Sequence, residues 1–116
     1  MIIWGELMDL NTYIRAVSNN RFGGGKVKKE EIKRVYLECK NQKIKPIINY
    51  PVTIRFRWYC KNNRKDLDNV AFAKKMVLDG MVMAGVLKND SRKFVSGFED
   101  VFFIDKKSPR VEVDYL

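Results

Sequence analysis

The sequence predicts a small α+β fold, in which a mixed sheet of about four strands is backed by two main helices. Residues 52–60 alternate strictly between apolar and other side chains, as a strand with one buried face does. Residues 28–42 and 70–84 instead carry apolar side chains at helical spacing. Because helical and strand patterns are interleaved and two strand-like segments end the chain, we expect a sheet covered by helices.

The first part of the chain predicts one strand, one short helix and a loop. Residues 1–7 have the composition of an edge or second strand. Residues 10–17 favour a short helical turn, with Tyr13 and Ile14 packed inward. Residues 18–26 contain two asparagines, Arg21 and three successive glycines, which is typical of a flexible cationic loop. No Gly-Lys-Ser/Thr follows these glycines, so the segment is not a Walker P-loop.

The remaining elements follow from the same rules. The polar face of the strand at 52–60 either is solvated or lines a nucleic-acid surface. The helix at 70–84 is predicted to be continuous and to end at Gly85. Residues 95–104 and 110–115 predict two final strands, and we expect the turn between them to lie away from the acidic end of the sheet described below.

Length and composition favour a single domain spanning residues 1–116. No apolar run reaches the roughly 18 residues that a membrane span needs, and the start of the chain lacks the basic region of a signal peptide. We therefore expect a cytoplasmic protein with no membrane partner.

The chain has no histidine and only two cysteines. The absence of histidine excludes a histidine base, a Ser-His-Asp triad and the common histidine zinc sites. Cys39 and Cys60 lie on apolar faces without Cys-x-x-Cys spacing, so buried free thiols are expected. Any chemistry must come from Asp, Glu, Lys, Tyr or Ser together with a metal ion.

Positive charge is concentrated in the first half of the chain. The net charge is +9, and residues 11–65 hold fifteen Lys or Arg against three acids, a local net charge of +12. This segregation is typical of a phosphate-binding surface beside an acidic centre. Scattered charge for solubility would not produce it.

Two acids, Asp66 and Asp68, follow the strand at 52–60 and stand one residue apart. Asp68 or Asn69 is a natural N-cap for the next helix, which needs only one acid. Two carboxylates on the same side of an extended chain repel each other and favour a cation between them. Hard cations such as Mg²⁺ bind carboxylate oxygens, and Asp90 is the candidate for a third ligand.

A lysine on the following helix completes this group. Lys75 comes seven residues after Asp68, about two helical turns on. It therefore projects from nearly the same face as Asp68, with Asp79 one turn further along, whereas Lys74 points elsewhere.

These residues resemble the RusA-type Holliday junction resolvases. The pattern consists of Arg64-Lys65, Asp66-Leu67-Asp68-Asn69, Lys75, Leu78-Asp79-Gly80-Met81, Gly85 and Asn89-Asp90. Weaker support comes from residues 10–13 and 18–21, and the resemblance extends over the whole chain. The lysine of the family commonly stands six residues after the first Asp, where this chain has Phe72, so either Lys74 or Lys75 takes that role.

The resemblance implies Mg²⁺-dependent hydrolysis of DNA four-way junctions by a homodimer, in recombination and repair. Asp66, Asp68 and Asp90 would hold one or two Mg²⁺ ions, for which Mn²⁺ can substitute, and Lys75 would be the fourth catalytic residue. No small-molecule cofactor is expected. The family is common in phages and prophages. DNA contacts are expected from a set of basic and amide side chains, namely Arg15, Asn19, Asn20, Arg21, Lys26, Lys28, Arg64 and Lys65.

Two alternatives remain. A basic module without catalysis could bind single-stranded DNA or RNA by stacking bases with Trp58, Tyr59 and the Gly-rich loop, and a family member could have lost its activity. A nuclease requires its three carboxylates to converge, whereas a binding module does not. A dimer contact is expected on the long helix, which has apolar residues beyond its inner face, namely Phe72, Met76, Leu78 and Met83.

Overall fold

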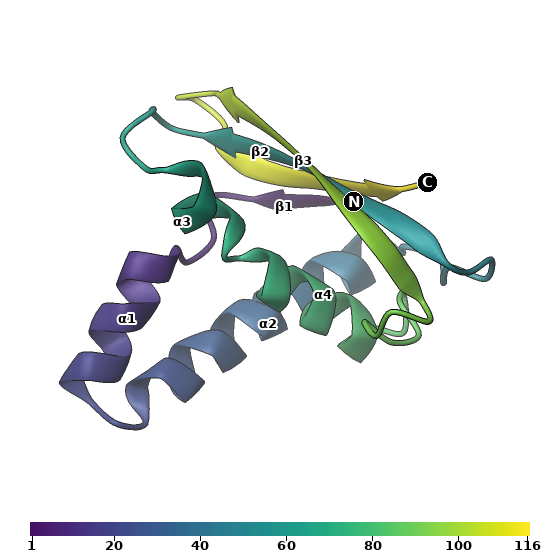
Figure 1. Cartoon of the computed structure of the whole chain (residues 1–116), viewed down its shortest axis with the longest axis horizontal. Coiled ribbons are helices and arrows are strands. Elements are labelled where there is room, and N and C mark those ends of the chain that lie inside the picture. The colour runs from purple at the N-terminus through teal and green to yellow at the C-terminus, as the bar shows by residue number, and fades with distance from the viewer.

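Four strands form one mixed sheet in the order β1-β4-β2-β3 (Figure 1). The computed structural model describes all 116 residues. The strands are β1 (Ile2–Trp4), β2 (Val52–Cys60), β3 (Val95–Ile104) and β4 (Arg110–Tyr115). β4 lies antiparallel to both β1 and β2, and β3 lies parallel to β2 at the edge. The predicted α+β class and the central position of residues 52–60 are confirmed.

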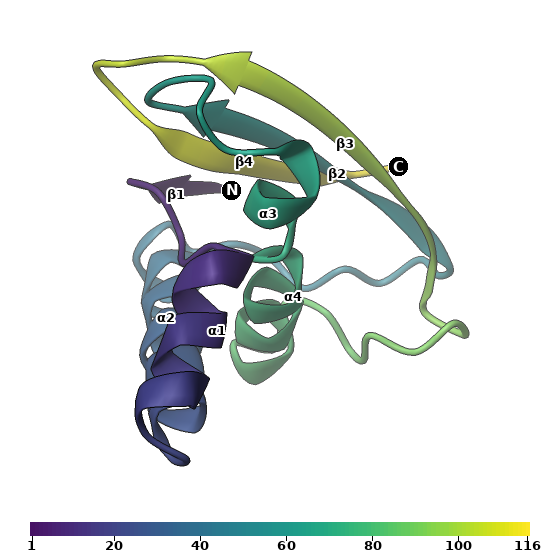
Figure 2. The ribbon, with the colours of Figure 1, turned by 60° about the vertical axis from the view of Figure 1, so that its left-hand side comes forward.

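All helices lie on one face of this sheet and leave the other face open (Figures 1 and 2). They are α1 (Leu10–Asn19), α2 (Gly23–Asn41), α3 (Leu67–Ala71) and α4 (Lys74–Met83). α2 and α4 are the two main helices and pack against each other. α1 and α2 form a hairpin whose tip projects beyond the sheet, and we call the whole hairpin, residues 10–41, the helical arm.

The core lies between the helices and the inner face of the sheet. β2 alternates as predicted, with Ile54, Phe56 and Trp58 buried and the intervening side chains half-buried. From the helices, Val35 and Met76 are fully buried against this surface. Burying each such side chain contributes roughly 1.5–3 kcal/mol, so this layer holds the helices on the sheet.

Glycines at the start of α2 form a helix, and the predicted flexible loop at residues 18–26 is wrong. A Cβ atom on Gly24 would lie 2.4 Å from the Val17 side chain and 2.9 Å from the Tyr13 ring. Only glycine allows α1 and α2 to approach so closely. The Asn20 side chain accepts the Phe22 N–H at 2.9 Å and closes the short turn between the helices. Ile14, expected to pack inward, is exposed on this arm.

The predicted continuous helix at residues 70–84 is interrupted between α3 and α4. Phe72 stacks on Tyr13 of α1 with ring centroids 5.2 Å apart, and Ala73 is buried. At this break the chain tightens, and the Lys75 N–H donates to the Phe72 C=O three residues before it. Gly85 ends α4 with a φ of 76°, as expected.

Both cysteines are free and buried, as predicted. Burial raises the pKa of the Cys39 and Cys60 thiols, which keeps them protonated and unreactive. None of the helices is both long and apolar enough to cross a membrane.

Candidate functional site

Two loops meet at one end of the sheet because β2 and β3 are parallel. Cys60 stands opposite Ile104, and the Asp105 N–H donates to the Cys60 carbonyl at 2.8 Å. The loop at 61–66 and the turn at 105–109 are therefore neighbours. The expectation that this turn lies away from the acidic end is wrong, because parallel pairing brings the ends of both strands to the same edge.

Asp66 and Asp68 are exposed at the start of α3. The Asp66 backbone occupies the N-cap position, but its side chain makes no capping hydrogen bond. The Asp68 carboxylate accepts only the adjacent Asn69 N–H, at 2.9 Å. Neither carboxylate is in an ion pair. Capping therefore leaves the Asp66 side chain without a structural role.

Asp90 is held by Lys75. The Lys75 Nζ lies 2.8 Å from Asp90 Oδ2 and 3.1 Å from Asp79 Oδ1. The hydrogen bond from Lys75 lowers the pKa of Asp90, and the bonds to Asp90 and Asp79 raise the pKa of Lys75. The predicted alignment of Lys75 with Asp79 is confirmed.

Lys74 takes a different environment. Its Nζ donates to Asp100 at 2.6 Å and lies 4.6 Å from the centre of the Phe98 ring. The two adjacent lysines thus point to different acids, and only Lys75 contacts a predicted site residue.

The three predicted metal ligands do not form one group. No three Asp, Glu, Cys or His side chains lie close enough together to hold a metal ion. Asp90 has a lysine as its counter-ion, and Asp66 and Asp68 lie at the start of α3. As placed, these residues do not fit a three-carboxylate Mg²⁺ site.

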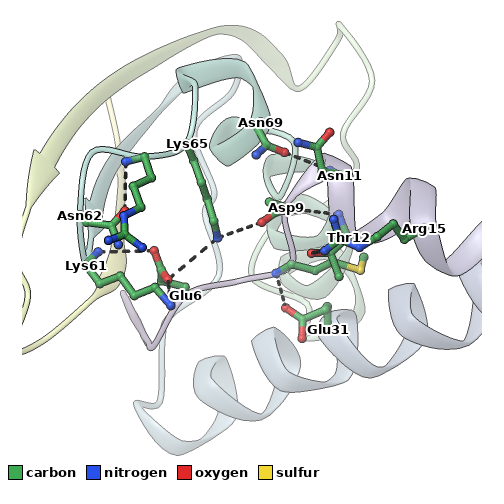
Figure 3. A network of polar contacts seen from close by, with 12 residues as sticks. Glu6, Asp9, Asn11, Thr12, Arg15, Glu31, Lys61, Asn62, Lys65 and Asn69 are labelled. Carbon is green, nitrogen blue, oxygen red and sulfur yellow. Dashed lines mark hydrogen bonds and ion pairs between the residues drawn. The ribbon is translucent and has the colours of Figure 1, made fainter.

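An ion pair between Asp9 and Lys65 fixes the loop that carries the acids (Figure 3). Asp9 is only 8% exposed, and its side chain caps α1 by accepting the Thr12 N–H at 2.7 Å and lies 2.8 Å from the Lys65 Nζ. Burial alone would raise the pKa of Asp9, but the hydrogen bonds from Lys65 and Thr12 outweigh it and lower the pKa. The Asn11 N–H also donates to the Asn69 side chain at 3.0 Å.

Sequence reasoning did not find this pair. Asp9 and Lys65 are far apart in the chain, and the only local signal was an acid three residues before Thr12, a helix N-cap pattern. Lys65, expected to contact DNA, is instead engaged with Asp9 and lies 4.0 Å from Glu6. Contacts to the start of α1 are therefore made by Lys65 and by Asn69, the residues just before and just after the segment that carries Asp66 and Asp68.

The other predicted DNA contacts fall on exposed surfaces. Arg15, Asn19, Asn20, Arg21 and Lys26 are exposed near the tip of the helical arm, and Lys28 lies over the Tyr13 ring. Arg64 is exposed in the loop after β2. None of these cations is in an ion pair.

Trp58 is unavailable for stacking a base. It is buried, and its indole N–H donates to Asp100 at 2.9 Å. The predicted role of Trp58 in base stacking is therefore wrong, because the strand turns this side chain into the core. The dimer surface expected on the long helix is smaller than predicted, because Met76 and Leu78 are buried in the core. Met83 is exposed.

The arrangement can bind phosphate on the arm and presents two unpaired carboxylates beside a cationic loop.

A comparison of the sequence with models of protein families finds no match, and neither does a comparison with curated proteins.

Proposed function

We propose that the chain is an Mg²⁺-dependent endonuclease that cuts DNA four-way junctions. On this proposal it acts in the cytoplasm, as a homodimer, in recombination and repair, and Mn²⁺ can replace Mg²⁺. The observation that carries the proposal is the contact of 2.8 Å between Lys75 and Asp90. These are the lysine and the downstream acid that the resemblance names, and they come from separate segments.

Charge supports the same function. The helical arm carries cations without acidic partners, which suits contacts with the phosphates of a duplex. Asp66 and Asp68 lie where the central strand ends, in a segment fixed to α1 by the Asp9–Lys65 pair. Lys75 would place its positive charge near the phosphate that is cut.

A second candidate, a nucleic-acid-binding module without catalysis, is favoured by one observation. The three acids do not form a metal-ligand group. For this reason we assign no step to the metal itself. The module would bind branched or single-stranded nucleic acid with the same cationic arm and would not need Asp66, Asp68 or Asp90.

Incubation of the purified protein with an end-labelled four-way junction, with Mg²⁺ or with EDTA, tests the two candidates. The nuclease should produce symmetrical nicks near the branch point in Mg²⁺ and none in EDTA. It should not cut a linear duplex of the same sequence. Binding of the junction in EDTA without cutting in Mg²⁺ or Mn²⁺ would reject the nuclease and leave the binding module.

The proposed homodimer is tested separately by light scattering of the protein with and without the junction. A two-fold dimer would place one site on each of the two equivalent strands of a junction. A monomer bound to each junction would contradict this part of the proposal.

A further inference from the structure

Four side chains form a row across the open face of the sheet, one from each strand. Trp4 of β1 stands opposite Arg110 of β4, Arg110 stands opposite Tyr59 of β2, and Tyr59 stands opposite Phe103 of β3. On β1, β2 and β4 these positions alternate with buried ones, and Phe103 shares the face of its partner Tyr59, so all four lie on the face that no helix covers (Figure 2). We call Trp4, Arg110, Tyr59 and Phe103 the stacking row.

The flat groups of the row are in contact with one another. The Arg110 guanidinium carbon lies 3.8 Å from the centre of the Tyr59 ring and 5.8 Å from that of Trp4. The Tyr59 and Phe103 rings stack with their centres 4.8 Å apart and their planes 17° apart. The row is therefore a continuous line of planar groups.

Two carboxylates fix the central arginine. Arg110 contacts Asp105 at 2.8 Å and Glu112 at 2.7 Å. A guanidinium held by two carboxylates has little freedom left, so it keeps its place between the Trp4 and Tyr59 rings. The row is thus organised before any ligand arrives.

Both ends of the row remain open to solvent. Trp4 is 55% exposed and Phe103 is 40% exposed. Isolated exposed apolar residues are common, but here they are the two ends of one ordered line. Nucleic-acid bases have flat faces of this kind and stack on aromatic and guanidinium groups.

Exposed cations lie near the row, on the two segments that meet at the same end of the sheet. Lys61 and Arg64 are exposed on the loop after β2, and Lys106 and Lys107 are exposed on the turn before β4. Of these four, only Lys61 lies within ion-pair distance of an acid, at 3.7 Å from Glu6. Cations beside a stacking surface complement the phosphates that join successive bases.

We propose that the stacking row binds the unpaired bases of a single nucleic-acid strand, while these four cations contact its phosphates. The proposal goes beyond the nuclease, because base stacking needs neither a metal nor any of Asp66, Asp68 and Asp90. It also concerns a different surface from the helical arm, whose cations suit a duplex. The ligand is defined by its flat bases and linked phosphates.

The test uses the full-length protein, EDTA and a decamer of thymidylate, so that cleavage plays no part. Trp4 and Trp58 are the only tryptophans, and Trp58 is buried. Stacking on Trp4 should therefore quench the tryptophan fluorescence saturably. Trp4→Phe should keep the affinity, measured by anisotropy of a labelled strand, and lose the quenching.

Phe103→Leu tests the row directly, because leucine stays apolar and has no flat face. We expect about tenfold weaker binding of the decamer, the loss of roughly one base stack, and no change for an abasic decamer with the same phosphates. Phe103→Tyr should restore binding. Phe22→Leu is the matched control, since Phe22 is an exposed phenylalanine on the helical arm.

Equal affinity of the wild type for the normal and abasic strands would overturn the proposal. So would normal binding by Phe103→Leu, or an equal loss in Phe22→Leu. Should Phe103→Leu fail to fold, Trp4→Leu at the other end of the row must give the same loss of base-dependent binding. None of these outcomes depends on whether the protein cuts junctions.

Discussion

Cations on the sheet have acidic partners, whereas most cations on the helical arm do not. On the sheet, Arg55, Arg57 and Arg110 all lie within ion-pair distance of a carboxylate. On the arm, Arg34 is the only cation in an ion pair. The other arm cations have no acidic partner, and three of them, Arg21, Lys28 and Lys40, lie over aromatic rings.

This difference separates structural charges from available ones. Arg55 and Arg57 pair with acids on neighbouring strands, so their charges have little attraction left for a phosphate. Unpaired cations on a projecting hairpin create a positive field that a phosphate backbone can neutralise. The acids show the same contrast, since Asp66 and Asp68 are unpaired while Asp90 is bound to Lys75.

The largest expected effect concerns an unpaired acid. Asp68→Asn should reduce Mg²⁺-dependent cutting of a junction by about two orders of magnitude. Asparagine retains an oxygen for the Asn69 N–H, so α3 should still form. Junction binding in EDTA should stay the same or tighten, because one negative charge near the phosphates is removed.

Glu99→Gln is the control for this prediction, because Glu99 is an acid that is paired with Arg55 on the sheet. It should leave the cutting rate unchanged. Equal losses of cutting and binding in Asp68→Asn would mean that the residue supports the fold and not the chemistry.

The second prediction concerns the arm. Replacing Arg15, Arg21, Lys26 and Lys28 with glutamine should weaken duplex and junction binding and flatten its dependence on salt. Each lost phosphate contact should reduce the slope of log affinity against log salt by about 0.9. Titrations at several salt concentrations measure the slope.

Arg55 and Arg57 provide the matched comparison within the protein. Their replacement by glutamine should change the slope little, because Glu99 and Asp114 already neutralise them. A larger change in the sheet variant than in the arm variant would mean that the duplex binds the sheet and not the arm.

Local patterns predicted the elements whose environment is periodic. The alternation of residues 52–60 gave β2, and the patterns at 95–104 and 110–115 gave β3 and β4 with the observed bounds. The phase of Lys75 with Asp79 also followed from helical geometry. In each case the signal lies within one segment.

Contacts between distant segments decided the features that the sequence did not reveal. Residue 24 of α2 is glycine where the Tyr13 and Val17 side chains leave no space for a larger residue. The helical pattern is interrupted at Phe72, which stacks on Tyr13 of another helix. The pairing of Asp9 with Lys65, and the position of the 105–109 turn, depend on chain topology and leave no local pattern.

A third prediction tests how tightly α2 of the helical arm packs on α4. A Cβ atom on Gly80 of α4 would lie 2.5 Å from the Val35 side chain of α2. Gly80→Ala should therefore push α2 away and lower the free energy of unfolding by about 2 kcal/mol. Urea unfolding measures this change.

Gly25→Ala is the control, because nothing lies within 4 Å of the added atom. Gly25 is within α2, so alanine there should raise the free energy of unfolding by about 0.5–1 kcal/mol. Equal effects of the two substitutions would show that α2 is not packed tightly on α4.

The smallest expected effect concerns the paired acid. Asp90→Asn breaks the ion pair with Lys75, whose side chain is 53% exposed, so the free energy of unfolding should fall by only about 0.5 kcal/mol at pH 7. The hydrogen bond from Lys75 lowers the pKa of Asp90 in the folded protein. The pair therefore contributes fully above the unfolded pKa, near pH 4, and its contribution is lost as the pH falls through the lower folded value.

Lys75 stays charged across this range, because its own pKa is raised. The difference in stability between wild type and Asp90→Asn should thus be constant from about pH 5 to 9 and vanish near pH 2. A double-mutant cycle with Lys75→Met isolates the pair from other effects of each substitution. A loss of several kcal/mol would mean that Asp90 is a structural acid like Asp9, whereas the small loss expected here leaves its carboxylate free to exchange Lys75 for another cation.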